Sequence, residues 1–339
     1  MKTTSELTTE DHLHSLGQYN LVYNNDFRYF SNRKDKEYGV PDGWVYTDRG
    51  VNGKINYDSS SNNCVVITKS EGNESMLFKQ ALHEFPRWQQ MLLGKTITGK
   101  IKLNTDKDGI VKVTLSDGIT SFSGSILKKG DTEIDLQLTI DNAATELTIT
   151  IESTAPFMVV SISSCNVNIG KISLPNLPSI INGIIGERKQ YIATENPPPE
   201  ELSLCNAPIA LTKNQTRLNS VLNGRFGKDS NGYSMLIDMR GYFSRAWDNG
   251  ATIDPNSRDR IAPGNGNITG NHVSTLQKDS FLKHQHGLAF TVSSVQSTTG
   301  GTSPNTNLVT PAPSNTNEDK DGEETRPINI YELYTIKWA

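Results

Sequence analysis

The sequence predicts a mainly β protein, and two observations carry this prediction. Within residues 18–170, successive runs carry apolar side chains at every second position, which is typical of strands that bury one face. Turn-forming sequences such as Asp117-Gly118 and Lys129-Gly130 separate these runs. Because strands with one buried face need a second sheet to cover them, we expect residues 18–170 to form an antiparallel β-sandwich of the jelly-roll type.

The alternating runs of this sandwich follow one another along the chain. Their apolar positions lie at 97–103, 111–115, 134–140, 147–151, 158–162 and 167–169. The residues before the sandwich, 1–17, are polar and are expected to form an N-terminal tail. After it, Pro175, Pro178 and a proline triplet at 197–199 predict a semi-rigid Pro-rich linker over residues 171–205.

Residues 206–339 are expected to form a second domain, with weaker alternation and many glycine and asparagine residues. It contains a polar stretch, 293–324, which is longer than an ordinary loop of a compact domain. Apolar residues alternate again between 328 and 338, which predicts a closing strand docked in the core.

Composition and charge narrow the classes of function. Hydrophobic residues make up 35% of the 339-residue chain, charged residues make up 21%, and the net charge is -4. Without a basic surface, a nucleic-acid partner is not expected. Cys64, Cys165 and Cys205 lie too far apart in sequence to suggest a disulfide framework or a metal-binding pair.

Neither a membrane span nor a signal peptide is expected. The sequence has no run of about 18 apolar residues, the length that a spanning helix needs. Its first residues lack the apolar stretch of a signal peptide. We therefore expect the protein to be synthesised in a cytoplasm, and to be released by lysis if it works outside the cell.

Three stretches of the second domain resemble, in this order, the collar and tip region of phage tail fibres: DMRGYFSRAWDNGATIDPNSR (238–258), LKHQHGL (282–288) and ETRPINIYELYTIKW (324–338). The resemblance implies an intertwined, trimeric tail-fibre tip domain over residues 206–339. It implies a homotrimer in the tail fibre of a phage virion or a phage-tail-like contractile particle. The implied partners are a bacterial surface polysaccharide or lipopolysaccharide and a tail baseplate or fibre-shaft protein. The sandwich is similar, through FRYF and PDGW (Pro41 to Trp44), to jelly rolls of the carbohydrate-binding-module type.

A pair of histidines, His284 and His286, is the predicted metal site. On an extended segment both imidazoles project to the same face, but two ligands do not hold a metal ion stably. The resemblance implies that three chains supply six imidazoles to one ion on the threefold axis. The expected cofactor is one iron or zinc ion per trimer, since nitrogen ligands suit both metals. His12 and His14 have the same spacing but lie in the polar tail, where no site is expected.

Two regions are candidates for sugar recognition. The polar stretch 293–324 offers hydroxyl and amide groups that can hydrogen-bond sugars without stacking on them. Its predicted receptor-binding residues are Ser303, Asn305, Thr306, Asn307, Asn315 and Asn317. The alternative sugar-binding region is the sandwich, whose Trp44, Tyr46 and Trp88 could stack on sugars or could instead fill its core and edges.

An enzyme is not expected, although a glycan depolymerase is the alternative function. Such an enzyme needs two carboxylates about 5–10 Å apart in a cleft. Carboxylates such as Asp238 and Asp254 are present in the second domain, but no spacing sets them as a pair. The β-helix repeat of many such enzymes is absent from the sequence as well. We therefore expect the charges of the 238–258 stretch to hold loops together.

Overall fold

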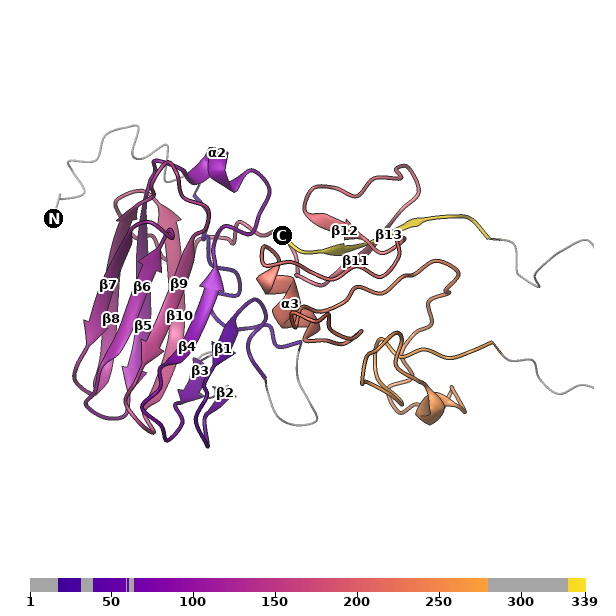
Figure 1. The fold of residues 1–339 in the computed structure, drawn as a ribbon, viewed down its shortest axis with the longest axis horizontal. Coiled ribbons are helices and arrows are strands. Elements are labelled where there is room, and N and C mark those ends of the chain that lie inside the picture. Colours follow the sequence, from indigo (N-terminus) through magenta and orange to yellow (C-terminus); the bar gives the residue numbers. More distant parts are fainter. Residues whose placement is uncertain (1–17, 32–38, 59, 61–63, 280–328) are drawn as a thin grey trace, which may run out of the picture. The chain divides into compact units, whose positions relative to one another are not determined.

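The computed structural model describes residues 18–31, 39–58, 60, 64–279 and 329–339. The chain divides into two compact units, one of Met1–Leu276 with Glu332–Ala339 and the other of Gln277–Tyr331. All helices and strands named below belong to the first unit. The prediction of a mainly β protein with an N-terminal antiparallel sandwich is confirmed (Figure 1).

The sandwich consists of two five-stranded sheets in which neighbouring strands pair antiparallel. The strands of the first sheet, in spatial order, are β1 (Val45–Thr47), β4 (Met76–Ala81), β9 (Thr148–Ser153), β6 (Val111–Ser116) and β7 (Ser121–Ile126). Those of the second are β2 (Lys54–Asp58), β3 (Cys64–Thr68), β10 (Val159–Ile169), β5 (Thr96–Thr105) and β8 (Gly130–Thr139).

The core of the sandwich lies between these sheets and follows the alternation of the sequence. In β6, Val111, Val113 and Leu115 are fully buried, while the residues between them are partly exposed. Trp44 and Phe78 also lie in this core, with ring centroids 4.5 Å apart and planes 6° apart. Burying one face of each strand in this way supplies most of the hydrophobic stabilisation.

A smaller three-stranded sheet has the order β11 (Arg188–Tyr191), β13 (Leu333–Lys337) and β12 (Glu201–Ser203). The closing strand predicted from the alternation near the C-terminus is β13, which is central in this sheet. The segment expected to be a Pro-rich linker, 171–205, contains β11 and β12, because both strands find their partner in β13. Its apolar run also buries Ile181 and Ile185.

Three short helical elements complete the described fold: α2 (Trp88–Leu92), α3 (Thr216–Leu222) and the 3-10 turn η3 (Ser257–Asp259). The start of α3 is fixed by Glu84, whose carboxylate accepts hydrogen bonds from the main-chain N–H groups of Thr216 and Arg217 at 2.6 and 2.9 Å. Arg217 is fully buried and donates to the carbonyl oxygens of Glu84 and Leu21. None of the helices in the described ranges has the length and apolar character to cross a membrane.

Candidate binding sites

The predicted metal site and receptor-binding loop lie outside the described residues. This applies to His284 and His286 and to the six loop residues between Ser303 and Asn317. Within the part of the chain that the structure describes, no three histidine, cysteine or acidic side chains form a group that could hold a metal ion. The iron or zinc ion and the trimer therefore stay predictions.

The three aromatic residues predicted to stack on sugars in the sandwich occupy different environments. Trp44 has no exposed surface, and its indole packs on Phe78. A stacking role for Trp44 is thus incompatible with its position, because neither ring face reaches solvent. Tyr46 and Trp88 are half-buried. The hydroxyl of Tyr46 donates a hydrogen bond to Asp48 at 2.9 Å. The pKa of the Tyr46 phenol is raised mainly by burial and to a lesser extent by this hydrogen bond.

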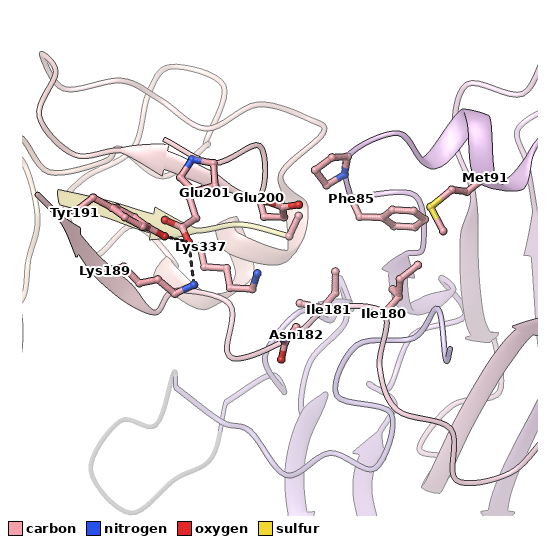
Figure 2. Close-up of a pocket in the computed structure, with 13 residues that line it drawn as sticks. Phe85, Met91, Ile180, Ile181, Asn182, Lys189, Tyr191, Glu200, Glu201 and Lys337 are labelled. Carbon is pink, nitrogen blue, oxygen red and sulfur yellow. Dashed lines mark hydrogen bonds and ion pairs between the residues drawn. The ribbon is translucent and has the colours of Figure 1, made fainter. Parts of the chain in front are cut away.

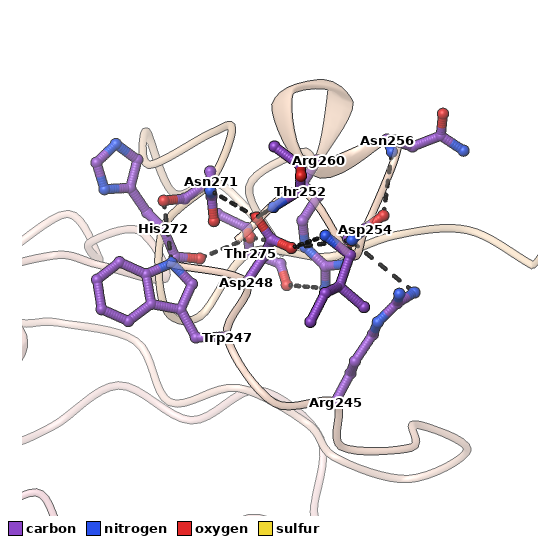
Figure 3. A network of polar contacts seen from close by, with 11 residues as sticks. Arg245, Trp247, Asp248, Thr252, Asp254, Asn256, Arg260, Asn271, His272 and Thr275 are labelled. Carbon is purple, nitrogen blue, oxygen red and sulfur yellow. Dashed lines mark hydrogen bonds and ion pairs between the residues drawn. The ribbon is translucent and has the colours of Figure 1, made fainter. Parts of the chain in front are cut away.

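The stretch 238–258 forms loops held by two carboxylates (Figure 3). Asp248 accepts hydrogen bonds from the main-chain N–H groups of Asp254, Ile253 and Thr252 at 2.9, 2.8 and 3.2 Å. These hydrogen bonds lower the pKa of Asp248, and the bond from Asp254 has the largest effect. The Asp248 carboxylate is therefore not a proton donor at neutral pH. Asp254 is itself buried and lies 3.1 Å from the guanidinium of Arg260.

Aromatic side chains project from these loops into solvent. Trp247 is 51% exposed, and its indole N–H donates to the carbonyl oxygen of Asn271 at 3.1 Å, which fixes the ring. Phe243 is 68% exposed and Tyr242 is 42% exposed. The structure thus places three large aromatic side chains of one short stretch at the surface. One sequence feature could have indicated their exposure: the three aromatic residues lie within six positions, and apolar and polar residues do not alternate there as they do in a buried strand.

Polar groups surround the fixed indole. Figure 3 shows two segments that meet here, one with Trp247 and Asp248 and the other with Asn271 and His272. The side-chain amide of Asn271 donates to Asp248 at 3.3 Å. The arrangement combines an apolar ring face with planar hydrogen-bonding groups, which is the chemistry that a sugar ring requires.

A second candidate site is a pocket of about 440 Å³ (Figure 2). Its apolar wall includes Phe85, Met91, Ile180 and Ile181, and its polar wall includes side chains of the three-stranded sheet. No local sequence pattern indicates this pocket, because its residues are contributed by segments far apart in the chain.

Glu201 is the centre of the polar wall. Its side chain is 3% exposed, and one carboxylate oxygen accepts hydrogen bonds from the amine of Lys189 and the hydroxyl of Tyr191, both at 2.9 Å. The hydroxyl of Thr335 donates to the other oxygen. Burial alone would raise the pKa of Glu201, but the hydrogen bonds from Thr335, Lys189 and Tyr191 outweigh it and lower the pKa. Glu201 is therefore a fixed anion that is already paired.

Lys337 is the other cation of this pocket. The residue is 5% exposed, and Figure 2 shows its amine pointing into the open centre of the pocket. Burial lowers the pKa of Lys337, and the positive charge of Lys189 lowers it further. Among the described residues, none forms a hydrogen bond or an ion pair with this amine.

Comparison with known protein families finds no family that matches the sequence. Protein RhiB of Rhizobium leguminosarum bv. viciae is 31% identical over 141 residues, which are 40% of this chain and 63% of that protein. The chain thus spans less than two thirds of the length of this relative.

Several solved structures are similar to part of the chain. A CBM4 module is 16% identical, with 44% of this chain and 99% of that chain covered and a TM-score of 0.34. The enzymatically active domain of tailspike protein 4 of bacteriophage CBA120 is 9% identical, with coverages of 44% and 21% and a TM-score of 0.34. The CBM22-1 xylan-binding domain of Xyn10C from Paenibacillus barcinonensis is 10% identical, with coverages of 46% and 95% and a TM-score of 0.31. These values do not establish a shared ligand or activity.

Proposed function

We propose that this chain is a trimeric tail fibre protein of a phage or a phage-tail-like contractile particle, and that it attaches to host-cell surface glycan without acting as an enzyme. The observation that supports glycan attachment is the exposed indole of Trp247, fixed in orientation within the stretch that resembles fibre tips. The proposed location is the tail fibre, reached after synthesis in the host cytoplasm and release by lysis.

Trp247 is suited to binding a sugar because its indole is both exposed and held in one orientation. An exposed tryptophan contributes little to the folding free energy, yet a hydrogen bond to Asn271 and the loops around Asp248 hold this one in a single orientation. A rigid aromatic face loses little entropy when a sugar ring stacks on it, and neighbouring amide and carboxylate groups can bond its hydroxyls. Each such contact is weak, so three copies on one fibre would bind far more tightly than one.

A second copy of the chain is the competing occupant of this surface. Apolar residues of the same loops, Phe243 and Ile253, are 68% and 78% exposed and could form contacts within the proposed trimer. The two occupants are separable by experiment. If a contact between subunits is lost, the mass of the protein oligomer in solution falls. If only a sugar contact is lost, adsorption to cells falls while the mass of the oligomer stays the same.

The test compares Trp247→Ala with the matched control Phe122→Ala, which removes a 44% exposed aromatic residue from β7 of the sandwich. We expect Trp247→Ala to weaken binding to the surface polysaccharide of susceptible cells about tenfold, or ~1.4 kcal/mol, as for loss of one aromatic contact. The control should bind as the unsubstituted protein does. Light scattering should give three times 37.4 kDa for all three proteins. Unchanged adsorption by Trp247→Ala would refute the glycan site, and a fall in mass would assign the surface to the trimer.

The remaining parts of the proposal come from the sequence alone. His284 and His286 of three chains would hold one iron or zinc ion, and a baseplate or fibre-shaft protein would attach the trimer to the particle. The loop residues between Ser303 and Asn317 would add hydrogen bonds to the same glycan.

A further inference from the structure

In the pocket of Figure 2, the amine of Lys337 faces the open space and forms no hydrogen bond or ion pair with the described residues. Lys189 and Lys337 both line it, but they differ in their contacts. Lys189 has a side chain that is 38% exposed, and its amine lies 2.9 Å from Glu201. Lys337 is 5% exposed, and no residue in the described ranges bonds to its amine. Ala339 lines the same pocket and forms no ion pair with Lys337.

The Lys337 side chain as a whole is buried, but its amine is not among the described polar atoms that are both inaccessible to solvent and unpaired. The amine therefore reaches the space of the pocket, where a ligand can contact it. The carboxylate of Glu201 does not pair with this amine, because Lys189, Tyr191 and Thr335 already occupy its oxygens. The electrostatics agree, since burial and the charge of Lys189 lower the pKa of Lys337 despite opposing effects of Glu200, Glu201 and Glu187. Glu200 also lines the pocket but forms no ion pair with Lys337, so an anion that entered the pocket would be in direct contact with an amine that these carboxylates do not reach.

The rest of the pocket restricts what kind of anion fits. A volume of about 440 Å³ lies in the range of small-molecule sites, which is roughly 300–1,000 Å³. Opposite the polar wall lie the apolar side chains of Phe85, Met91 and Ile180. The amide of Asn182 also lines the pocket and can donate and accept hydrogen bonds. These walls suit a ligand with one carboxylate, an apolar ring face and hydroxyl groups.

We propose that this pocket binds a carboxylate-bearing saccharide unit of the hexuronate class. The carboxylate contacts Lys337, and the ring lies against Phe85 and Met91. The pocket is lined by residues other than those around Trp247, so the site and its test do not depend on the proposed function.

The test uses the full chain and three probes: D-glucuronate, D-glucose and inorganic phosphate. Calorimetry compares the unsubstituted protein with Lys337→Met, Lys337→Arg and the control Lys79→Met, which removes an exposed lysine of β4. We expect glucuronate to bind the unsubstituted protein and the control equally, and Lys337→Met at least tenfold more weakly. Lys337→Arg keeps the charge and should bind within about threefold of the unsubstituted protein, since arginine also pairs with carboxylates. Glucose, which lacks the carboxylate, should bind at least tenfold more weakly than glucuronate.

A readout in the unsubstituted protein keeps the test independent of how the variants fold. A bound carboxylate raises the pKa of Lys337, so glucuronate should bind with proton uptake at alkaline pH, measured as a dependence of the calorimetric heat on the buffer. Binding of glucuronate to Lys337→Met as tightly as to the unsubstituted protein would overturn the proposal. So would the absence of glucuronate binding, or equal affinity for glucose. Phosphate affinity equal to that of glucuronate would overturn the saccharide assignment and leave a general anion site.

Discussion

Glu84 is expected to be a sensitive position for the stability of the described fold. The residue is 1% exposed, and its carboxylate accepts three hydrogen bonds at the start of α3, two from Thr216 and one from the N–H of Arg217. Its charge also raises the pKa of the Arg217 guanidinium, against the desolvation that lowers that pKa to about 10. Glu84→Ala removes the acceptor and the compensating charge together.

The expected magnitude follows from these contacts. A hydrogen bond to a charged group contributes about 1.5–3 kcal/mol, and such contributions are not additive at one carboxylate. Leaving a buried charge uncompensated costs about 3–5 kcal/mol. We therefore expect Glu84→Ala to lower the free energy of unfolding by about 4 kcal/mol, and Glu84→Gln, which keeps one acceptor oxygen, by about half as much. The matched control is Glu152→Ala, whose partly exposed carboxylate pairs with Lys112 and which should cost under ~1 kcal/mol.

Urea denaturation followed by tryptophan fluorescence measures these differences as shifts of the transition midpoint at constant slope. The double substitution of Glu84→Gln with Arg217→Met isolates the coupling, because the second change removes the charge that the first leaves uncompensated. The pair should then be less destabilising than the sum of the single changes by about 1–3 kcal/mol. A cost of Glu84→Ala no larger than that of the control, or strict additivity of the pair, would contradict the reasoning.

Three further outcomes are expected. The pKa of Glu201 is lowered in the folded protein, so its stabilising contribution is present above the unfolded value of about 4.3 and is lost as pH falls through the folded pKa. Glu201→Gln should therefore flatten the acid limb of a plot of unfolding free energy against pH and lower that free energy at neutral pH. Replacing His284 and His286 by alanine should remove the iron or zinc found by elemental analysis and lower the melting temperature; metal retained by the double variant would show that other ligands hold it. Replacing residues 297–320 by a short Gly-Ser linker should leave three subunits per particle and abolish adsorption to host cells; undiminished adsorption would assign recognition to another surface.

The sandwich was predictable where strands bury one face only. The runs at 111–115 and 147–151 correspond to β6 and β9 because alternate side chains there enter the core. The strands before residue 96 were not placed from the sequence, for a physical reason. β3 reads CVVIT, an apolar run without alternation, and β1 has three residues that are half-buried or exposed. Periodicity carries no signal in such strands.

Contacts between distant segments account for what the sequence did not indicate about residues 171–205. Local proline content predicts a spacer, yet β11 and β12 form because β13, more than 120 residues later, pairs with both. The same holds for Arg217 and Glu84, whose contact spans 133 positions. Lys337 and the apolar wall at Phe85 likewise come together only in the folded chain. Such sites depend on packing, which local patterns do not encode.

The two candidate sites differ in what holds the ligand, and this difference predicts how each responds to salt. At Trp247 the contact would be mainly apolar stacking on an indole that is 51% exposed, which moderate salt leaves almost unchanged. At Lys337 the contact would be an ion pair, whose partner must first give up its hydration to enter the pocket. Salt weakly screens the attraction between two buried charges, but it does screen the attraction that draws the anion towards the pocket. Chloride can also compete with the anion for the Lys337 amine. Binding of hexuronate in the pocket should therefore weaken as sodium chloride rises, while adsorption through the aromatic surface should persist. Measuring both at two salt concentrations separates the sites in the intact protein.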